Sequence, residues 1–193
     1  MTNLRHILTA VAALLLATPA PVLALGDACD DLWFTRNQIM DRAGYCFGSN
    51  LGRAVFDNAG CLGKDVAVSP ADRRKVSEIQ SQEQALECRV NTRQTRLDVP
   101  DINLRRALID LPIADGLESA CLGYQGPPLA LQAGHYDSAP RIGAVERGVT
   151  VHYAHYGGPE GWSYVLTHDG SGRILAGGWL RNPPRMDCDQ WAG

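Results

Sequence analysis

The chain has 193 residues, and its 18 basic and 21 acidic side chains give a formal net charge of −3 at pH 7. The charges form no run of one sign, so neither nucleic acid nor an anionic membrane surface is an expected partner. The six cysteines include no Cys-x-x-Cys pair, which leaves a zinc knuckle or a thioredoxin-type redox site without support.

Residues 1–24 have the pattern of a secretory signal peptide. Arg5 precedes an apolar run over residues 7–17, and Ala24 ends a stretch of small and apolar residues suited to cleavage. The apolar run is shorter than the roughly 20 residues that a membrane-spanning helix needs. We therefore expect a periplasmic or secreted protein without a membrane span.

The mature part begins with a predicted helix. Asp30 or Asp31 can cap its start, and Gly44 can end it. Leu32 and Ile39 fall at helical spacing between these positions, which predicts one apolar face.

A second helix has a sharper start signal. Ser69 offers a cap, Pro70 stands at the first helical position, and Asp72 supplies an acid in the first turn. Apolar residues continue at helical spacing to about Val90 among many charged side chains, which predicts an amphipathic surface helix. A shorter helix is expected over residues 102–109.

After Pro112 the sequence changes to glycine, proline and aromatic residues with alternating apolar positions. The expected strands cover residues 149–153, 162–166 and 174–180, with a turn at residues 168–172. The second half is therefore predicted to be a small β domain.

The predicted organisation is α+β in two parts. A signal segment over residues 1–24 precedes a helical domain over residues 25–111 and a β domain over residues 112–193. The core of the β domain is expected to include Val151 and Trp179.

The six cysteines all follow the expected signal segment, so three disulfides are expected in an oxidising compartment. Antiparallel packing of the first two helices would bring the start of one beside the end of the other. A second bridge would pin the loop after the first helix. A third would join the residue before the first strand to the residue after the last, and so close a barrel. Other pairings remain open, and the preferred pairing is Cys29–Cys88, Cys46–Cys61 and Cys121–Cys188.

The stretch over residues 32–47 resembles the YARHG domain of bacterial exported proteins and lipoproteins. That family carries an aromatic residue, Arg-Asn, an aliphatic residue, then Tyr-Ala-Arg-His-Gly and a further aromatic residue. The matching positions are Arg36, Asn37, Ile39, Arg42, Gly44, Tyr45 and Phe47. Met40, Asp41 and Ala43 replace the family's Tyr, Ala and His, so this chain could not use a catalytic histidine at that position. The resemblance covers roughly residues 29–90.

The remainder looks similar to the uncharacterised domain that follows YARHG in some proteobacterial proteins, with residues 121–124 as its most recognisable stretch. Within it, residues 129–181 resemble a bacterial SH3 domain, although residues 131–134 depart from that family's first loop. The resemblance implies an SH3-like β-barrel after a small disulfide-stapled helical domain. It also implies that the barrel binds peptidoglycan stem peptides or another protein.

The polar residues of the first helix are interpreted as a scaffold. Arg36, Asn37 and Arg42 lie on a helix that must also bury aromatic side chains, and a buried guanidinium needs partners. We expect this set, with Gly44 at the end of the helix, to fasten the helix to the segment over residues 48–56.

No catalytic or metal-binding set is predicted. His152 and His155 are three residues apart on a strand and therefore point to opposite faces, and no third zinc ligand lies nearby. Ser163 lies in Gly-Trp-Ser-Tyr-Val, which lacks the second glycine of a nucleophile elbow. The expected disulfides leave no thiolate for cysteine catalysis. The chain is therefore expected to be non-enzymatic, without a metal or cofactor.

Aromatic side chains of the second half are better candidates for ligand contact, since eight of the ten Tyr and Trp residues lie there. Aromatic residues in loops give a large contact area at low entropic cost. The expected partner is a cell-wall peptide or an envelope protein, and the alternative is an interaction or inhibitor module that acts on an envelope enzyme. The candidate ligand-binding residues are Tyr136, Tyr153, His155, Tyr156 and Trp162.

Overall fold

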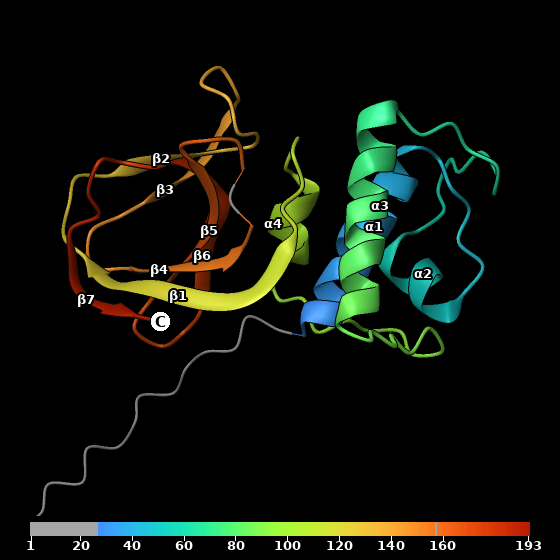
Figure 1. Ribbon diagram of the computed structural model, residues 1–193, viewed down its shortest axis with the longest axis horizontal. Coiled ribbons are helices and arrows are strands. Elements are labelled where there is room, and N and C mark those ends of the chain that lie inside the picture. The colour runs from blue at the N-terminus through green and yellow to red at the C-terminus, as the bar shows by residue number, and fades with distance from the viewer. Residues whose placement is uncertain (1–26, 157) are drawn as a thin grey trace, which may run out of the picture.

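The computed structural model describes residues 27–156 and 158–193, so the expected signal segment lies outside the described residues. Figure 1 shows a helical part and a β part side by side, with α4 between them. The fold is α+β, as predicted. None of the described helices is long and apolar enough to cross a membrane.

The helices precede the strands in the described chain. The helices are α1 (Ala28–Arg42), α2 (Asn50–Val55), α3 (Pro70–Ala85) and α4 (Ile102–Arg106). The strands are β1 (Ala114–Tyr124), β2 (Leu129–Gln132), β3 (Arg141–Val145), β4 (Thr150–His155), β5 (Trp162–His168), β6 (Ile174–Arg181) and β7 (Cys188–Ala192).

Helix α1 begins before the predicted cap. Asp27 is the capping residue, because its carboxylate accepts a hydrogen bond from the Asp30 backbone amide at 3.0 Å. The prediction of a cap at Asp30 or Asp31 is therefore wrong, and both residues lie in the first turn. The predicted end is confirmed, since Gly44 follows the helix with a left-handed φ of +88°.

Helix α3 starts as predicted but ends earlier. Ser69 Oγ accepts from the Asp72 amide at 3.1 Å, and Pro70 is the first helical residue. The helix stops at Ala85 and not near Val90, because Glu87 adopts a φ of +52° that a right-handed helix cannot contain.

The chain between α3 and the sheet also differs from expectation. Helix α4 ends at Arg106, short of the predicted residue 109. The Ile109 amide donates to Ala133 O at 2.6 Å, so the backbone leaves the helix to bind the β part. The short helix α2 was not predicted, and Ser49 Oγ caps it by accepting from the Gly52 amide at 3.0 Å.

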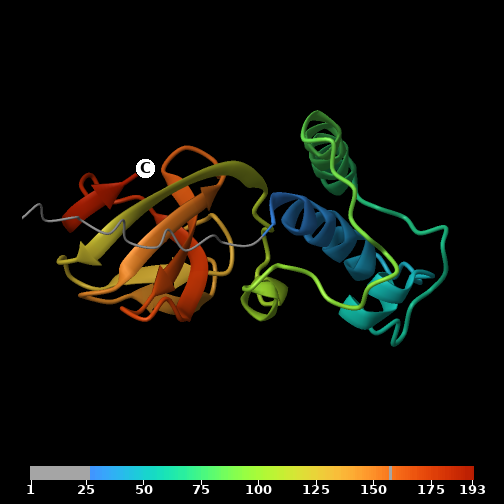
Figure 2. The same ribbon diagram turned by 90° about the horizontal axis from the view of Figure 1, so that it is seen from below.

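The strands form one seven-stranded antiparallel sheet in the order β3-β2-β6-β5-β4-β1-β7. The predicted strands near Val151, Tyr164 and Trp179 correspond to β4, β5 and β6. Figures 1 and 2 show that the sheet is strongly curved and that β1 runs along its side as a long strand.

The three disulfides have the predicted pairing, Cys29–Cys88, Cys46–Cys61 and Cys121–Cys188. The expected geometry of the third is wrong. Cys121 lies inside β1 and Cys188 begins β7, and these two strands are hydrogen-bonded neighbours. The bridge therefore ties a C-terminal edge strand to the sheet and does not close a barrel from end to end.

One cluster of buried apolar side chains joins the helical part to the sheet. Leu32, Ile39 and Ile79 of α1 and α3 pack in it with Tyr164 and other residues of the sheet. Val165, the neighbour of Tyr164 on β5, points to the opposite face and is buried in a second cluster inside the β part. Both faces of β5 are therefore covered, one of them by the helical part.

Candidate functional site

A buried set of charged and polar side chains lies where the two parts meet. Arg105 of α4 has no solvent exposure and donates from its two Nη atoms to Asp31 of α1 at 2.5 and 3.0 Å. It also donates to Thr35 Oγ1. Asp101 completes the pairing, with one carboxylate oxygen 3.9 Å from Arg105 Nη1 and the other accepting from the Tyr164 hydroxyl at 2.8 Å. This set links α1 and α4 to β5.

The pKa values in this set follow from burial and charge. Burial works against the Asp31 carboxylate, but Arg105 and His155 outweigh it and hold the pKa of Asp31 below its usual value. Burial likewise opposes the Arg105 charge, and the two carboxylates outweigh it and raise the Arg105 pKa. Burial and the Asp101 charge raise the pKa of Tyr164. The ion pair is therefore locked in its charged form at neutral pH.

His155 belongs to this buried set. Its Nε2 lies 3.2 Å from Asp31 Oδ2, and its side chain is 4% exposed. Its ring also packs edge-on against Tyr164, with ring centroids 5.0 Å apart. The structure thus places this predicted ligand-binding residue in an interdomain contact.

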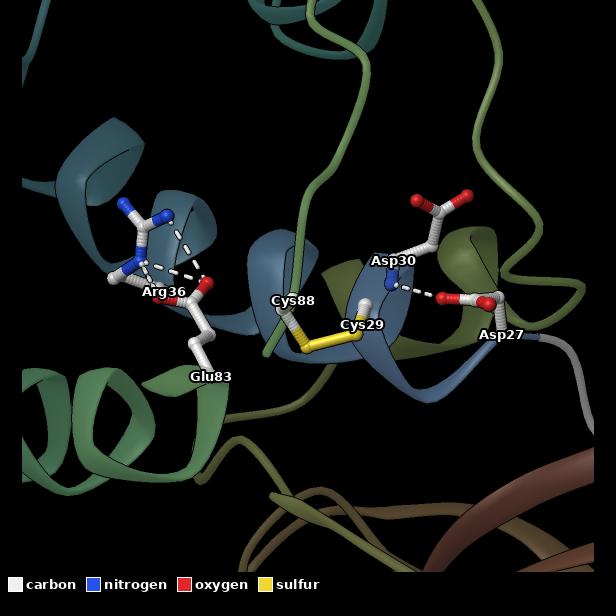
Figure 3. The surroundings of a disulfide bond; sticks show 6 residues. All are labelled: Asp27, Cys29, Asp30, Arg36, Glu83 and Cys88. Atoms are coloured by element: carbon white, nitrogen blue, oxygen red, sulfur yellow. Dashed lines mark hydrogen bonds and ion pairs between the residues drawn. A yellow bond between two sulfur atoms is a disulfide. The ribbon is translucent and has the colours of Figure 1, made fainter. Parts of the chain in front are cut away.

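The motif residues of α1 act as a scaffold, but their expected partner is wrong. Arg36 binds Glu83 of α3 with Nε–Oε2 at 3.0 Å, as Figure 3 shows beside the Cys29–Cys88 bridge. Asn37 donates to Trp33 O within its own helix at 2.7 Å. None of these bonds reaches residues 48–56.

Arg42 of the same motif reaches the segment that follows α4. Its Nη2 donates to Leu108 O at 2.6 Å and its Nη1 to Ile109 O at 3.1 Å. Residues 48–56 are held by another arginine, since Arg106 Nη2 donates to Val55 O. Asn58 pairs with both backbone polar groups of Phe47, which precedes that segment, at 2.8 and 2.9 Å.

A cavity of about 80 Å³ opens beside Arg42, on the helical side of the junction. Three elements contribute its walls: the end of α1, the start of α3 and the segment after α4. The lining residues are Ile39, Arg42, Asp72, Lys75, Ile109, Asp110 and Leu111. Lys75 Nζ donates to Leu111 O at 2.7 Å, so the ammonium is held at the wall.

Asp110 connects this cavity to the loop between β2 and β3. Its Oδ2 accepts from the His135 amide at 3.1 Å, and its backbone oxygen accepts from Trp179 Nε1 at 2.7 Å. A Cβ added at Gly134 would lie 2.6 Å from the Tyr136 ring and 2.7 Å from Asp110 Oδ2. The ring of Tyr136 and the Asp110 carboxylate are therefore close neighbours across Gly134.

The other predicted aromatic residues have different environments. Tyr136 and Tyr156 are 41% and 48% exposed, while Trp162 is buried and lies under the guanidinium of Arg181. Tyr153 is partly buried beside Trp191, and burial raises its pKa to about 12. Of the five candidates, Tyr136 and Tyr156 present the most surface to a ligand.

The loop that carries Tyr156 approaches the same region. The Tyr156 amide donates to Ile113 O at 2.8 Å, which holds the loop at the start of β1. A Cβ added at Gly158 would lie 2.8 Å from the Trp179 ring and 3.4 Å from His135. The loops of Tyr136 and Tyr156 thus meet over Trp179.

His152 and His168 form a separate buried pair on β4 and β5. Their rings meet edge-on with centroids 4.4 Å apart, and His168 Nδ1 has no hydrogen-bond partner among the described atoms. Burial lowers the pKa of both, and the neighbouring His152 helps to lower that of His168 to about 4. Within residues 27–156 and 158–193, no three His, Cys, Asp or Glu side chains are placed to hold a metal ion.

Sequence reasoning did not find the residues of the cavity. Lys75 and Asp110 come from segments 35 positions apart, and neither belongs to a recognisable motif. One feature of the sequence could have drawn attention to Lys75 as a site residue. It is one of only two lysines in the chain, whose remaining Lys and Arg positions are all arginines.

Two families match the chain. The YARHG domain matches residues 8–84, and the Domain of unknown function (DUF4453) matches residues 87–193, which is more than half of the chain. The predicted resemblance to a YARHG protein with a C-terminal domain of unknown function is confirmed. No curated protein and no solved structure gives a significant match. The disulfides and the YARHG domain together indicate an extracytoplasmic protein.

Proposed function

The chain belongs to the DUF4453 family and carries a YARHG domain before its DUF4453 domain, and we propose that it is an exported, non-enzymatic binding protein of the bacterial cell envelope. Its ligand is peptidoglycan or another envelope component. The observation that carries the proposal is the position of Tyr136, an exposed aromatic residue beside the charged cavity at Asp110.

The proposed organisation has a signal peptide over residues 1–24, a helical domain over residues 25–111 and an SH3-like domain over residues 112–193. The strongly curved antiparallel sheet, in which every described strand except β1 has four to eight residues, supports the SH3-like assignment. The paired cysteines support export to the periplasm or the medium, because disulfides persist in oxidising compartments.

Tyr136 and Tyr156 suit the recognition of a sugar or a short peptide. Each presents a rigid apolar ring with a polar hydroxyl, which gives contact area at low entropic cost. Asp110 and Lys75, in the adjacent cavity, add charged groups that can orient a ligand. Small-molecule sites occur preferentially at domain interfaces, and these residues lie at such a junction.

The side chains that most often perform hydrolytic chemistry support a non-enzymatic function. The six cysteines are all in disulfides, so no thiolate is present. His155 is buried against Asp31, and His152 and His168 are buried against each other. A substrate arriving at the surface would therefore not meet these three imidazoles, whereas His135, whose side chain is 26% exposed beside Asp110, remains accessible.

Co-sedimentation with purified cell-wall sacculi tests the proposal. The folded chain is mixed with sacculi, centrifuged and quantified in the pellet against a secreted protein of similar size and charge. The proposal predicts saturable enrichment in the pellet that soluble cell-wall fragments compete away. A supernatant that retains the chain at every sacculus concentration, together with no binding to any other envelope fraction, would contradict it.

An inhibitor module that acts on an envelope enzyme is the second candidate. The loop that contains Leu62 favours it, because the Cys46–Cys61 bridge holds the loop while Leu62 is 82% exposed. An apolar side chain on a rigid loop is suited to fill the cleft of another protein. Recovery of one envelope hydrolase with the chain, with loss of that hydrolase's activity and no sacculus binding, would select this alternative.

A further inference from the structure

The cavity at the junction is lined by two cations and two carboxylates that do not pair with each other. Arg42 comes from the end of α1, Asp72 and Lys75 come from the start of α3, and Asp110 comes from the segment after α4. Among the described residues, neither cation lies within 4.0 Å of a carboxylate oxygen. The two cations are therefore available to a ligand, while Asp110 Oδ2 lies 3.7 Å from His135 Nδ1 and leaves its other oxygen to the cavity.

The two cations have spare hydrogen-bond donors. Lys75 donates to Leu111 O, and Arg42 donates to Leu108 O and Ile109 O. An ammonium carries three N–H groups and a guanidinium carries five, so both retain donors beyond those bonds. Burial lowers the pKa of each group, and the charges of Asp72 and Asp110 offset part of this effect for both. A ligand carboxylate between them would further favour the charged form of both cations.

The two carboxylates make the site different from a phosphate site. Asp72 Oδ2 is bonded to Ser69 Oγ at 2.7 Å, and Asp110 Oδ2 accepts from the His135 amide at 3.1 Å. Each has a second oxygen that can accept from a ligand. The four charges sum to zero. A dianion such as phosphate would therefore be attracted by the two cations and repelled by the two carboxylates. A ligand with one positive and one negative group matches all four.

The size of the cavity limits that ligand. About 80 Å³ holds roughly five water-sized groups. An α-carboxylate, its α-carbon and its ammonium together comprise five non-hydrogen atoms. Ile39, Ile109 and Leu111 supply apolar wall against which a short aliphatic side chain can rest.

We propose that this cavity binds the zwitterionic head group of an amino acid, with the carboxylate at Lys75 and Arg42 and the ammonium at Asp72 and Asp110. The inference deepens the proposed function and rests on it, because a cell-wall peptide that contains a diamino acid can carry a free ammonium and a free carboxylate on one side-chain carbon. The exposed Tyr136 ring beside Asp110 then contacts the remainder of the ligand.

Titration of the isotopically labelled chain, followed by its amide resonances, tests the inference with four small probes. Glycine, acetate, methylammonium and inorganic phosphate are added separately at millimolar concentrations. Glycine is expected to shift the resonances of residues around Lys75 and Leu111 saturably, with an affinity at least tenfold above that of acetate or methylammonium. Phosphate that binds as tightly as glycine would overturn the inference in favour of a plain anion site.

Variants separate the two halves of the head group. Lys75→Met is expected to weaken glycine binding at least tenfold, whereas Lys64→Met, at an exposed lysine outside the cavity, leaves it unchanged. Asp72→Asn is expected to weaken glycine binding without weakening acetate binding, because it removes a partner of the ammonium and a charge that repels acetate. Equal glycine affinity in the wild type and both cavity variants would overturn the inference.

The outcome is distinguishable from failure of the proposed function. Sacculus binding without any glycine response in the cavity would overturn the head-group site and leave the envelope-binding proposal standing. A glycine response without sacculus binding would support the head-group site and count against peptidoglycan as the ligand.

Discussion

Arg105 and Asp31 form a buried two-point ion pair that joins the helical part to the junction with the sheet, with Nη–Oδ distances of 2.5 and 3.0 Å. Asp31 also contacts His155 of β4, while Asp101 beside Arg105 accepts from Tyr164 of β5. The relative position of the two parts is therefore fixed by directional polar contacts as well as by the shared apolar core. A binding site that draws residues from both parts needs such a fixed geometry.

Loss of the Arg105 charge should be costly for stability. Arg105→Met leaves two buried carboxylates without their cation, and breaking a buried pair in this way typically costs about 3 to 5 kcal/mol. Arg181→Met is the control, since its pair with Asp137 is exposed on both sides and is expected to change stability by less than about 1 kcal/mol. Urea unfolding of both variants measures the difference. Equal midpoints would show that the buried pair contributes nothing.

The His152–His168 pair should make the fold sensitive to mild acid. The pKa of His168 is lowered from 6.5 to about 4 in the folded chain, so the unfolded chain takes up this proton first as the pH falls. The stabilising contribution is complete above pH 6.5 and is lost between pH 6.5 and 4, by up to about 3 kcal/mol. His168→Gln should flatten the dependence of unfolding free energy on pH in this window. The same slope in wild type and variant would assign the acid sensitivity to other groups.

Removal of the Cys121–Cys188 bridge should weaken both parts. Its ends are 67 positions apart, and the chain-entropy model gives such a bridge a stabilisation of about 4 kcal/mol. The same model gives about 3 kcal/mol for Cys46–Cys61, whose ends are 15 positions apart. Because Ile39 and Tyr164 share one core cluster, the double alanine variant at 121 and 188 should lose helical and β circular-dichroism signals in a single transition. A helical signal that outlasts the β signal on heating would mean that the parts unfold independently.

Gly134→Ala should displace the proposed binding residues without disturbing the core. The new methyl group would lie 2.6 Å from the Tyr136 ring and 2.7 Å from Asp110 Oδ2, so one of these side chains must move. Gly170→Ala is the matched control, because a Cβ there meets nothing within 4 Å. Sacculus binding is expected to fall at least several-fold for the first variant alone. Retained binding with an unchanged melting temperature would place the ligand elsewhere.

Features that depend on short sequence signals could be predicted. The cap at Ser69 and the proline at 70 define the start of α3 locally, and the predicted pairing of the first disulfide assumes that this helix packs antiparallel to α1. That packing brings Cys29 to Cys88, which is why the pairing could be inferred before the structure.

Features that depend on tertiary contacts could not be predicted. Strand β1 contains Asp115 and Glu118 among small residues, so it lacks the alternation that marks a strand. The partners of Arg42 are the backbone oxygens of Leu108 and Ile109. Every residue carries a backbone oxygen, so the sequence pattern does not indicate which one an arginine will bind. The cavity could not be predicted from the sequence either, because it forms only where three segments that are distant in the chain meet.

The most direct test of the account compares sacculus binding by the wild type with that of Tyr136→Ala/Tyr156→Ala, using Leu62→Ala as an exposed apolar control. Binding curves from co-sedimentation, recorded alongside melting temperatures, separate loss of contact from loss of fold. The account predicts that the double tyrosine variant loses at least tenfold in affinity with an unchanged melting temperature, while Leu62→Ala binds as the wild type does. Full binding by the double tyrosine variant, with loss in Leu62→Ala, would contradict it.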